Sequence, residues 1–178
     1  IVGGPPCQGF SSANRWQKEL DDPRNKLFFQ YLRFVKVLRP KAILIENVRG
    51  LLTRDKGYAK DRIVKLLSGM GYNVNNTILD SSNYGVPQTR KRAFFVAFRK
   101  EFKDIIFDFD KIPHLPKVTV EDAIGELYQL EQGDTTRIPT PPGNEYTRYL
   151  RYGSEVLNDH TATYPAEIVQ KRISFVPQ

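Results

Sequence analysis

The sequence predicts an α/β fold, as part of a doubly wound, Rossmann-like sheet. Strand and helix patterns alternate as strand, helix, strand, helix, strand over the first hundred residues or so. Ala42 to Glu46 is apolar until its closing carboxylate, which is typical of a strand buried on both faces of a parallel sheet. The chain has 178 residues, 40% hydrophobic and 26% charged, a balance found in soluble globular domains.

Each predicted element rests on its own signals. Apolar residues recur at helical spacing from Lys26 to Leu38, with Asp22-Pro23 before them and Pro40 after them. The segment Ser68-Gly69-Met70-Gly71 ends a second helix, because glycine tolerates the left-handed cap conformation, and Thr119 is an N-cap for a third. The predicted strands cover residues 1–4, 42–46, 72–80 and 93–98, and the predicted helices cover residues 26–38, 60–68 and 118–127.

Composition excludes several classes of protein. One cysteine rules out an internal disulfide framework, and the distant His114 and His160 predict no metal site. No apolar run approaches the roughly 20 residues that span a bilayer, and no signal peptide is evident, which predicts a cytoplasmic protein. The net charge of +7 is compatible with a nucleic-acid partner. Ile1 continues a strand pattern that should begin earlier, so a piece of a longer protein, or one chain of a split enzyme, is expected.

Polar residues gather at the ends of the predicted strands. Residues 4–11 follow the first strand, Glu46-Asn47-Val48 follow the second, and residues 88–92 lead into the last. Because ligands bind at the carboxyl ends of strands in open α/β sheets, these three segments are predicted to form one site.

These segments resemble the motifs of the DNA cytosine-5 methyltransferases. PPCQGFS is similar to the family's nucleophile motif, ENV to its acid motif and QTRKR to its Q-x-R-x-R motif, in the family's order and spacing. The resemblance is close over about residues 1–110 and weaker over 119–178. It implies a class I S-adenosylmethionine-dependent methyltransferase sheet, truncated at its N-terminus. Residues 1–117 would be the catalytic portion, and residues 118–178 a linker and the start of the target-recognition region.

The chemistry explains the residue types. A thiolate that adds to carbon 6 of cytosine makes carbon 5 nucleophilic enough to take a methyl group, and Cys7 fits that role. A lone cysteine is more often a buried structural thiol, but Pro5, Pro6 and Gly9 place this one on an exposed turn. Glu46 would hydrogen-bond or protonate ring nitrogen 3, and its alternative role is a structural ion-pair partner.

The remaining site residues rest mainly on the resemblance. In an extended chain Gln88, Arg90 and Arg92 would face one side. Arg92 is implied to touch the flipped base and Arg90 to hold the nucleophile loop or the phosphate backbone; a solvated basic strand edge is the alternative. Asn47 is expected to shape its turn. The expected methyl-donor contacts are Pro6 and Leu27, and the expected substrate contacts are Pro5, Gln8, Ser11, Asn47, Val48 and Gln88.

The resemblance implies S-adenosylmethionine as methyl donor and double-stranded DNA with a flipped cytosine as substrate, in a restriction-modification setting. The family's glycine-rich donor-binding turn and most of its recognition region have no counterpart in this sequence. The isolated chain is therefore expected to be inactive and to bind the donor weakly. Two alternatives remain open: a transfer RNA cytosine-5 methyltransferase of the same family, and a non-catalytic nucleic-acid-binding subunit.

Overall fold

The computed structural model describes residues 1–6, 26–102, 105–127, 142–152 and 166–175. The chain divides into two compact units, Ile1–Lys117 and Val118–Gln178, and each is described by itself. That the first is catalytic and the second leads into a recognition region remains a prediction.

The first unit is built on a mixed four-stranded sheet. Its strands are β1 (Val2–Gly3), β2 (Ala42–Val48), β3 (Tyr72–Asp80) and β4 (Lys91–Arg99), in the order β1-β2-β4-β3. β1 runs parallel to β2, whereas β4 runs antiparallel to both β2 and β3. The predicted α/β class is confirmed.

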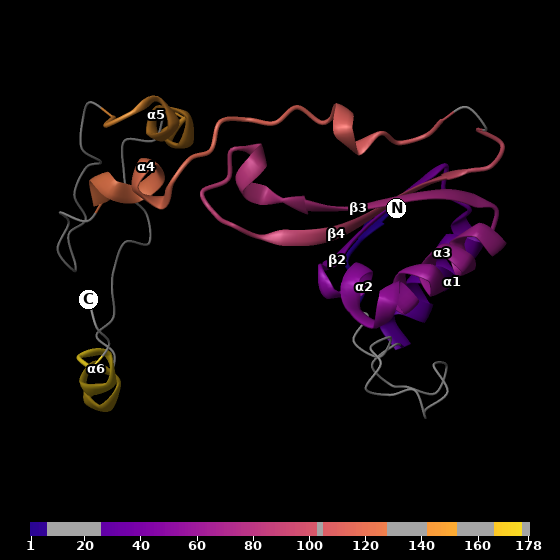
Figure 1. Cartoon of the computed structure of the whole chain (residues 1–178), viewed down its shortest axis with the longest axis horizontal. Helices are drawn as coiled ribbons and strands as arrows, with labels where there is room; N and C mark the ends of the chain where they lie inside the picture. Colours follow the sequence, from indigo (N-terminus) through magenta and orange to yellow (C-terminus); the bar gives the residue numbers. More distant parts are fainter. Residues whose placement is uncertain (7–25, 103–104, 128–141, 153–165, 176–178) are drawn as a thin grey trace. The chain divides into compact units, whose positions relative to one another are not determined.

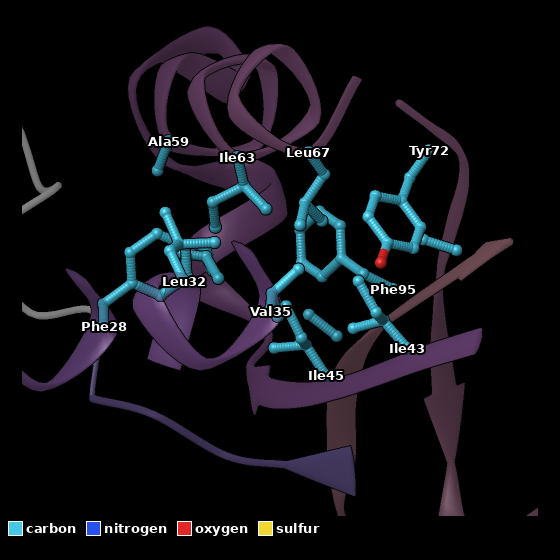
Figure 2. Close-up of a cluster of buried hydrophobic side chains, with 13 residues drawn as sticks. Phe28, Leu32, Val35, Ile43, Ile45, Ala59, Ile63, Leu67, Tyr72 and Phe95 are labelled. Carbon is cyan, nitrogen blue, oxygen red and sulfur yellow. The ribbon is translucent and has the colours of Figure 1, made fainter. Parts of the chain in front are cut away.

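Three helices lie against one face of this sheet (Figure 1): α1 (Lys26–Leu38), α2 (Gly50–Thr53) and α3 (Tyr58–Gly69). Figure 2 shows side chains from α1 and α3 meeting side chains from β2, β3 and β4 in the core. This burial is the main stabilising term for the unit. The buried core comprises Phe28, Leu32, Val35, Ile43, Ile45, Leu51, Ala59, Ile63, Leu67, Tyr72, Ala93, Phe95 and Ala97.

The structure corrects the expectation that the strand beginning at Ala42 is buried on both faces. Ile43, Ile45 and Asn47 are buried, while Leu44 and Glu46 between them are only partly buried. The reason is that β2 pairs with an antiparallel neighbour and, among the described residues, helices cover one face only. Glu46 therefore lies on the face opposite α1, α2 and α3.

Two strands extend further than their apolar runs predicted. β2 continues to Val48 and β4 begins at Lys91, because the antiparallel ladder between them pairs Asn47 with Ala93 and Val48 with Arg92. The cross-strand hydrogen bonds satisfy polar backbone groups that hydropathy does not register. The acid and the arginine therefore lie inside paired strands and not in turns beyond them.

Tyr31 fixes α1 to the edge of the sheet. A Cβ atom on Gly3 of β1 would lie 2.8 Å from Cε2 of Tyr31, so only glycine lets the ring pack there. The hydroxyl approaches the carbonyl oxygen of Leu44 at 3.4 Å, at the outer limit of a hydrogen bond. Burial, with a smaller contribution from the nearby Tyr72, raises the pKa of Tyr31 to about 12.

This raised pKa predicts a loss of stability at alkaline pH. An unfolded chain ionises tyrosine near pH 10, whereas folded Tyr31 keeps its proton to about pH 12, so the unfolded state binds fewer protons between these values. The free energy of unfolding should therefore fall from pH 10 to pH 12, and urea denaturation would measure the slope. The slope should be shallower in Tyr31→Phe and unchanged in Tyr149→Phe, a position 74% exposed. Equal slopes in wild type and Tyr31→Phe would contradict the assignment.

The second unit contains α4 (Val120–Ile124), α5 (Glu145–Arg151) and α6 (Glu167–Ile173). Thr119 caps α4 in a reciprocal capping box with Asp122, so the predicted N-cap is confirmed. The Nδ2 of Asn144 donates to the main-chain oxygen of Asp122 at 2.8 Å, which ties α5 to α4. Arg151 of α5 also forms an ion pair with Glu126, which lies in the 3₁₀ turn Gly125–Leu127 after α4.

Two classes of feature are missing from the described part of the chain. None of its helices is both long and apolar enough to cross a membrane. The described residues also contain no group of three His, Cys, Asp or Glu side chains that could hold a metal ion.

Candidate active site

The centre of the candidate site is an ion pair between β2 and β4. Nε of Arg92 lies 2.9 Å from Oε1 of Glu46, and Nη1 of Arg92 donates to the main-chain oxygen of Lys91 at 3.0 Å. The ladder pairs Glu46 with Phe94 and Val48 with Arg92, so the charged partners are diagonal neighbours on one face. The side chains of Arg92 and Glu46 are 24% and 43% exposed, so an aromatic base could reach both.

Asn47 holds the segment that leads to Cys7. Its side chain is on the buried face of β2, where Nδ2 donates to the main-chain oxygen of Pro5 at 2.8 Å. Oδ1 accepts from the N–H of Val48 at 2.9 Å, which fixes the orientation of the amide. Asn47 therefore fixes the main chain two residues before Cys7, which agrees with a structural role for this residue.

Gly4 allows the carboxylate of Glu46 to lie beside that same segment. A Cβ at position 4 would sit 3.3 Å from Oε2 of Glu46 and 3.4 Å from its main-chain oxygen. Oε1 of the same carboxylate faces Arg92. Glu46 thus stands between the arginine on β4 and the segment leading to Cys7, and the structure brings together Pro5, Glu46, Asn47 and Arg92.

Three of the other predicted site residues, Cys7, Gln8 and Ser11, lie outside the described residues. Val48 is 56% exposed at the end of β2.

The predicted alternation of Gln88, Arg90 and Arg92 on one face needs correction. The N–H of Gln88 donates to the oxygen of Val86 at 2.7 Å, which makes a tight turn, and extended pairing begins only at Lys91. Gln88 and Arg90 are both exposed and precede the strand. The sequence interpretation began the strand too early. The alternating pattern of Gln88, Arg90 and Arg92 looks the same in the sequence whether the chain is extended at Gln88 or turns there.

Sequence reasoning missed Asp80 and Ser81, which close the hairpin in front of Arg92. Oδ1 of Asp80 accepts from the N–H of Arg90 and from the N–H and hydroxyl of Ser82. Partial desolvation raises the pKa of the Asp80 carboxyl, but these hydrogen bonds outweigh it and hold the pKa below its usual value. An Asp-Ser-Ser run at the end of a strand is a turn signal that could have indicated this.

The described residues supply only part of a binding site for a methyl donor. Pro6 is exposed after β1, and Leu27 is 61% exposed at the start of α1. Both offer apolar surface, but neither side chain carries a group that would bind the ribose or the amino-acid end of S-adenosylmethionine. These two residues fit one wall of a donor site, and the polar contacts must come from other residues.

The bond from Asn47 to Pro5 gives a testable expectation. Asn47→Asp keeps the shape but replaces the donor with an acceptor, which would face the buried Pro5 oxygen. The free energy of unfolding should fall by about 1–3 kcal/mol, the cost of a buried group left without its partner. Asn76→Asp, the same change at a partly exposed position of β3, should alter it by less than about 0.5 kcal/mol. Urea denaturation measures both, and equal losses would contradict a specific role for the bond.

Comparison with known proteins places the chain in a family. The C-5 cytosine-specific DNA methylase family matches residues 1–170. The chain is 40% identical over 172 residues to the type II methyltransferase M.DdeI of Desulfomicrobium norvegicum, covering 91% of this chain and 41% of that protein. It is 38% identical over 148 residues to M.NgoPII of Neisseria gonorrhoeae, covering 82% of this chain and 41% of that protein. The chain thus spans about two fifths of the length of these relatives.

A solved structure supports the fold as well. A DNA modification methyltransferase encoded within a prophage in E. coli superposes with a TM-score of 0.67 at 28% identity, over 99% of this chain and 55% of that one. The α/β sheet, with its acid and arginine on neighbouring strands, is therefore that of a Rossmann-like class I methyltransferase. Within that class the chain belongs to the C-5 cytosine-specific DNA methylase family.

Proposed function

We propose that this chain carries the attacking half of a DNA cytosine-5 methyltransferase, which moves a methyl group from S-adenosylmethionine to carbon 5 of a flipped cytosine through a covalent adduct with Cys7. The observation that carries the proposal is the Glu46–Arg92 pair, placed beside the segment that leads to Cys7. Glu46 would be the acid, Arg92 the cation and Cys7 the nucleophile that this reaction needs.

The reaction requires the ring to be activated first. The Cys7 thiolate forms a bond to carbon 6, and the ring electron pair moves toward nitrogen 3, where Glu46 stabilises or protonates it. Carbon 5 then has enamine character and would take the methyl group of a bound sulfonium donor, whose sulfur–methyl bond breaks to leave a neutral thioether. The proton on carbon 5 would pass to water, and its electron pair would re-form the double bond between carbons 5 and 6 as the sulfur–carbon bond breaks, which restores the aromatic ring and frees Cys7 as the thiolate.

Arg92 has two functions in this proposal. Its Nε–H holds one oxygen of Glu46 and leaves the other for the base, and its positive charge stabilises negative charge on the neighbouring ring edge. Arg90 would hold the nucleophile loop or the DNA backbone. Pro5, Gln8, Ser11, Asn47, Val48 and Gln88 would contact the substrate or shape the surface around it.

S-adenosylmethionine supplies an electrophilic methyl sulfonium when bound, and Pro6 and Leu27 would form one wall of its site. β1 lies at the end of the sheet and, within the described residues, pairs on one side only. We expect a further polypeptide segment to add the donor-binding strands there, and another to complete the recognition region. The isolated chain is therefore expected to be inactive and to bind the donor weakly.

The substrate is proposed to be double-stranded DNA. The two relatives described above are type II methyltransferases, so we propose a restriction-modification role in the cytoplasm. The net charge of +7 suits a phosphate backbone.

Covalent trapping tests the proposal. The experiment uses a composite enzyme, in which this chain replaces the matching region of the Desulfomicrobium norvegicum methyltransferase. A duplex containing 5-fluorocytosine blocks loss of the group on carbon 5, so the adduct with Cys7 should accumulate in the presence of the donor. A transfer RNA containing 5-fluorocytosine serves as the comparison. An adduct with RNA alone would favour the transfer RNA enzyme, and no adduct with either would overturn the proposed chemistry.

A further inference from the structure

The hairpin between β3 and β4 is closed by side chains at its base. The last ladder pair joins Asp80 to Lys91. One step beyond it, Oδ1 of Asp80 accepts from the N–H of Arg90 at 3.2 Å, and the N–H of Ser81 donates to the oxygen of Arg90 at 3.1 Å. Both polar main-chain groups of Arg90 are thus held by neighbouring residues at the end of β3.

Ser81 makes a second hydrogen bond to the segment that leads into β4. Its hydroxyl donates to the main-chain oxygen of Gln88 at 2.6 Å. Asp80 also caps the 3₁₀ turn Ser81–Tyr84 through the N–H of Ser82, so a single carboxylate joins the start and the end of the loop. The chain between Gln88 and Lys91 is therefore fixed at two positions before β4 begins.

The tip of the hairpin has a separate support. The N–H of Leu115 donates to the oxygen of Asn83 at 2.9 Å, and the rings of Tyr84 and His114 meet edge to face with centroids 5.4 Å apart. Gly85 adopts a φ of +72°, and a Cβ there would lie 3.2 Å from Cδ1 of Leu115. Since these contacts do not involve Asp80, loss of its carboxylate should loosen the base of the hairpin and leave the tip in place.

We propose that Asp80 and Ser81 are positioning residues, which set the main chain of Gln88 and Arg90 so that Arg92 enters β4 opposite Val48, with its guanidinium beside Glu46. The inference rests on the proposed function, because it gives that register a catalytic consequence. Capping the 3₁₀ turn alone would need only the bonds to Ser82. The bond from the N–H of Arg90 to Asp80 is not needed for capping, and it is the contact that reaches the segment before Arg92.

Loss of these few hydrogen bonds should lower the reaction rate strongly. Arg92 is two residues from Arg90, and one strand residue advances the chain by roughly 3.3 Å, so a small change at Arg90 moves the guanidinium relative to Glu46. A displacement of about 1 Å in a catalytic group can lower a rate by roughly 10²-fold.

The test measures the rate of adduct formation by the composite enzyme on the 5-fluorocytosine duplex, at saturating and at low DNA. Asp80→Ala should lower the saturated rate by roughly 10- to 100-fold and change the half-saturating DNA concentration much less. Asp80→Asn should recover most of the rate, because its side-chain oxygen can still accept from the N–H of Arg90. Ser81→Ala, which removes only the bond to Gln88, should give a smaller loss of the same kind.

Asp108 provides the matched control. It caps another 3₁₀ turn, Phe109–Lys111, by accepting from the N–H of Asp110 at 3.1 Å. This hydrogen bond does not involve residues 88–92, which contain Arg90 and Arg92. Asp108→Ala should leave the adduct rate unchanged. An unchanged rate in Asp80→Ala would overturn the inference, as would equal losses in Asp80→Ala and Asp108→Ala or a failure of Asp80→Asn to recover. If wild type forms no adduct at all, it is the proposed function that fails. Protection of the Arg90 amide from hydrogen exchange in this chain, lost in Asp80→Ala, then still tests the positioning contact.

Discussion

Cys7→Ser should abolish the covalent adduct with a 5-fluorocytosine duplex and lower methyl transfer by the composite enzyme by roughly 10³-fold or more, the size of effect seen when a nucleophile is removed. A serine hydroxyl has the same shape but is hardly ionised at neutral pH, whereas a thiol gives an appreciable fraction of thiolate. Gel shift of the denatured complex, with peptide mapping of the attached base, measures the adduct.

Binding and stability should be unaffected by the same change. Pro5 keeps its bond from Asn47 in the variant, so the segment before residue 7 remains attached to β2. DNA affinity should be within a few-fold of wild type, and the free energy of unfolding should change by less than about 0.5 kcal/mol. A base adduct formed by the serine variant, or an adduct mapped to another residue, would show that Cys7 is not the nucleophile.

The fold was predictable from the sequence where one periodicity dominated. The helix over Lys26–Leu38 and the strand over Tyr72–Asp80 were predicted with the bounds that the structure gives them. The direction of β4 was not predictable, because antiparallel pairing depends on which strand lies beside β2. That arrangement follows from tertiary packing and leaves little trace in hydropathy.

The candidate site was predictable as a set of residue types and not as a set of contacts. Glu46 and Arg92 were both selected, but the ion pair between them follows from the ladder register that pairs Val48 with Arg92. Asn47 was expected to shape its turn, and its bond to Pro5 crosses 42 residues of sequence, beyond any local rule. Asp80 was passed over because its action on Arg90 also requires the closed hairpin.

Removing the charge of Glu46 should lower the reaction rate strongly and change the stability of the protein little. Glu46→Gln keeps the size of the side chain but removes both the negative charge that Arg92 holds and the ability to transfer a proton to ring nitrogen 3. The rate of adduct formation by the composite enzyme should fall by roughly 10²- to 10³-fold, the range for loss of a general acid or an electrostatic stabiliser. Rapid-quench trapping on the 5-fluorocytosine duplex measures this rate.

The stability of the protein should change little, because Glu46 is 43% exposed and ion pairs of this kind contribute roughly 0–1 kcal/mol. Arg99 and Glu101 form a matched pair at the other end of β4, with side chains 22% and 52% exposed. Glu101→Gln removes the same charge from an ion pair with another arginine of β4. It should lower the free energy of unfolding by a comparable small amount and leave the adduct rate unchanged.

The double variant Glu46→Gln with Arg92→Lys tests whether the two residues act as a unit. If Arg92 works mainly by orienting Glu46, the second substitution should cost much less in the Glu46→Gln background than in wild type, since the carboxylate it orients is already gone. Lysine keeps the charge but loses the fixed planar geometry that gives the Nε–H contact. Additive losses would instead assign Arg92 an independent contact with the base, and equal rates for Glu46→Gln and Glu101→Gln would remove Glu46 from the mechanism.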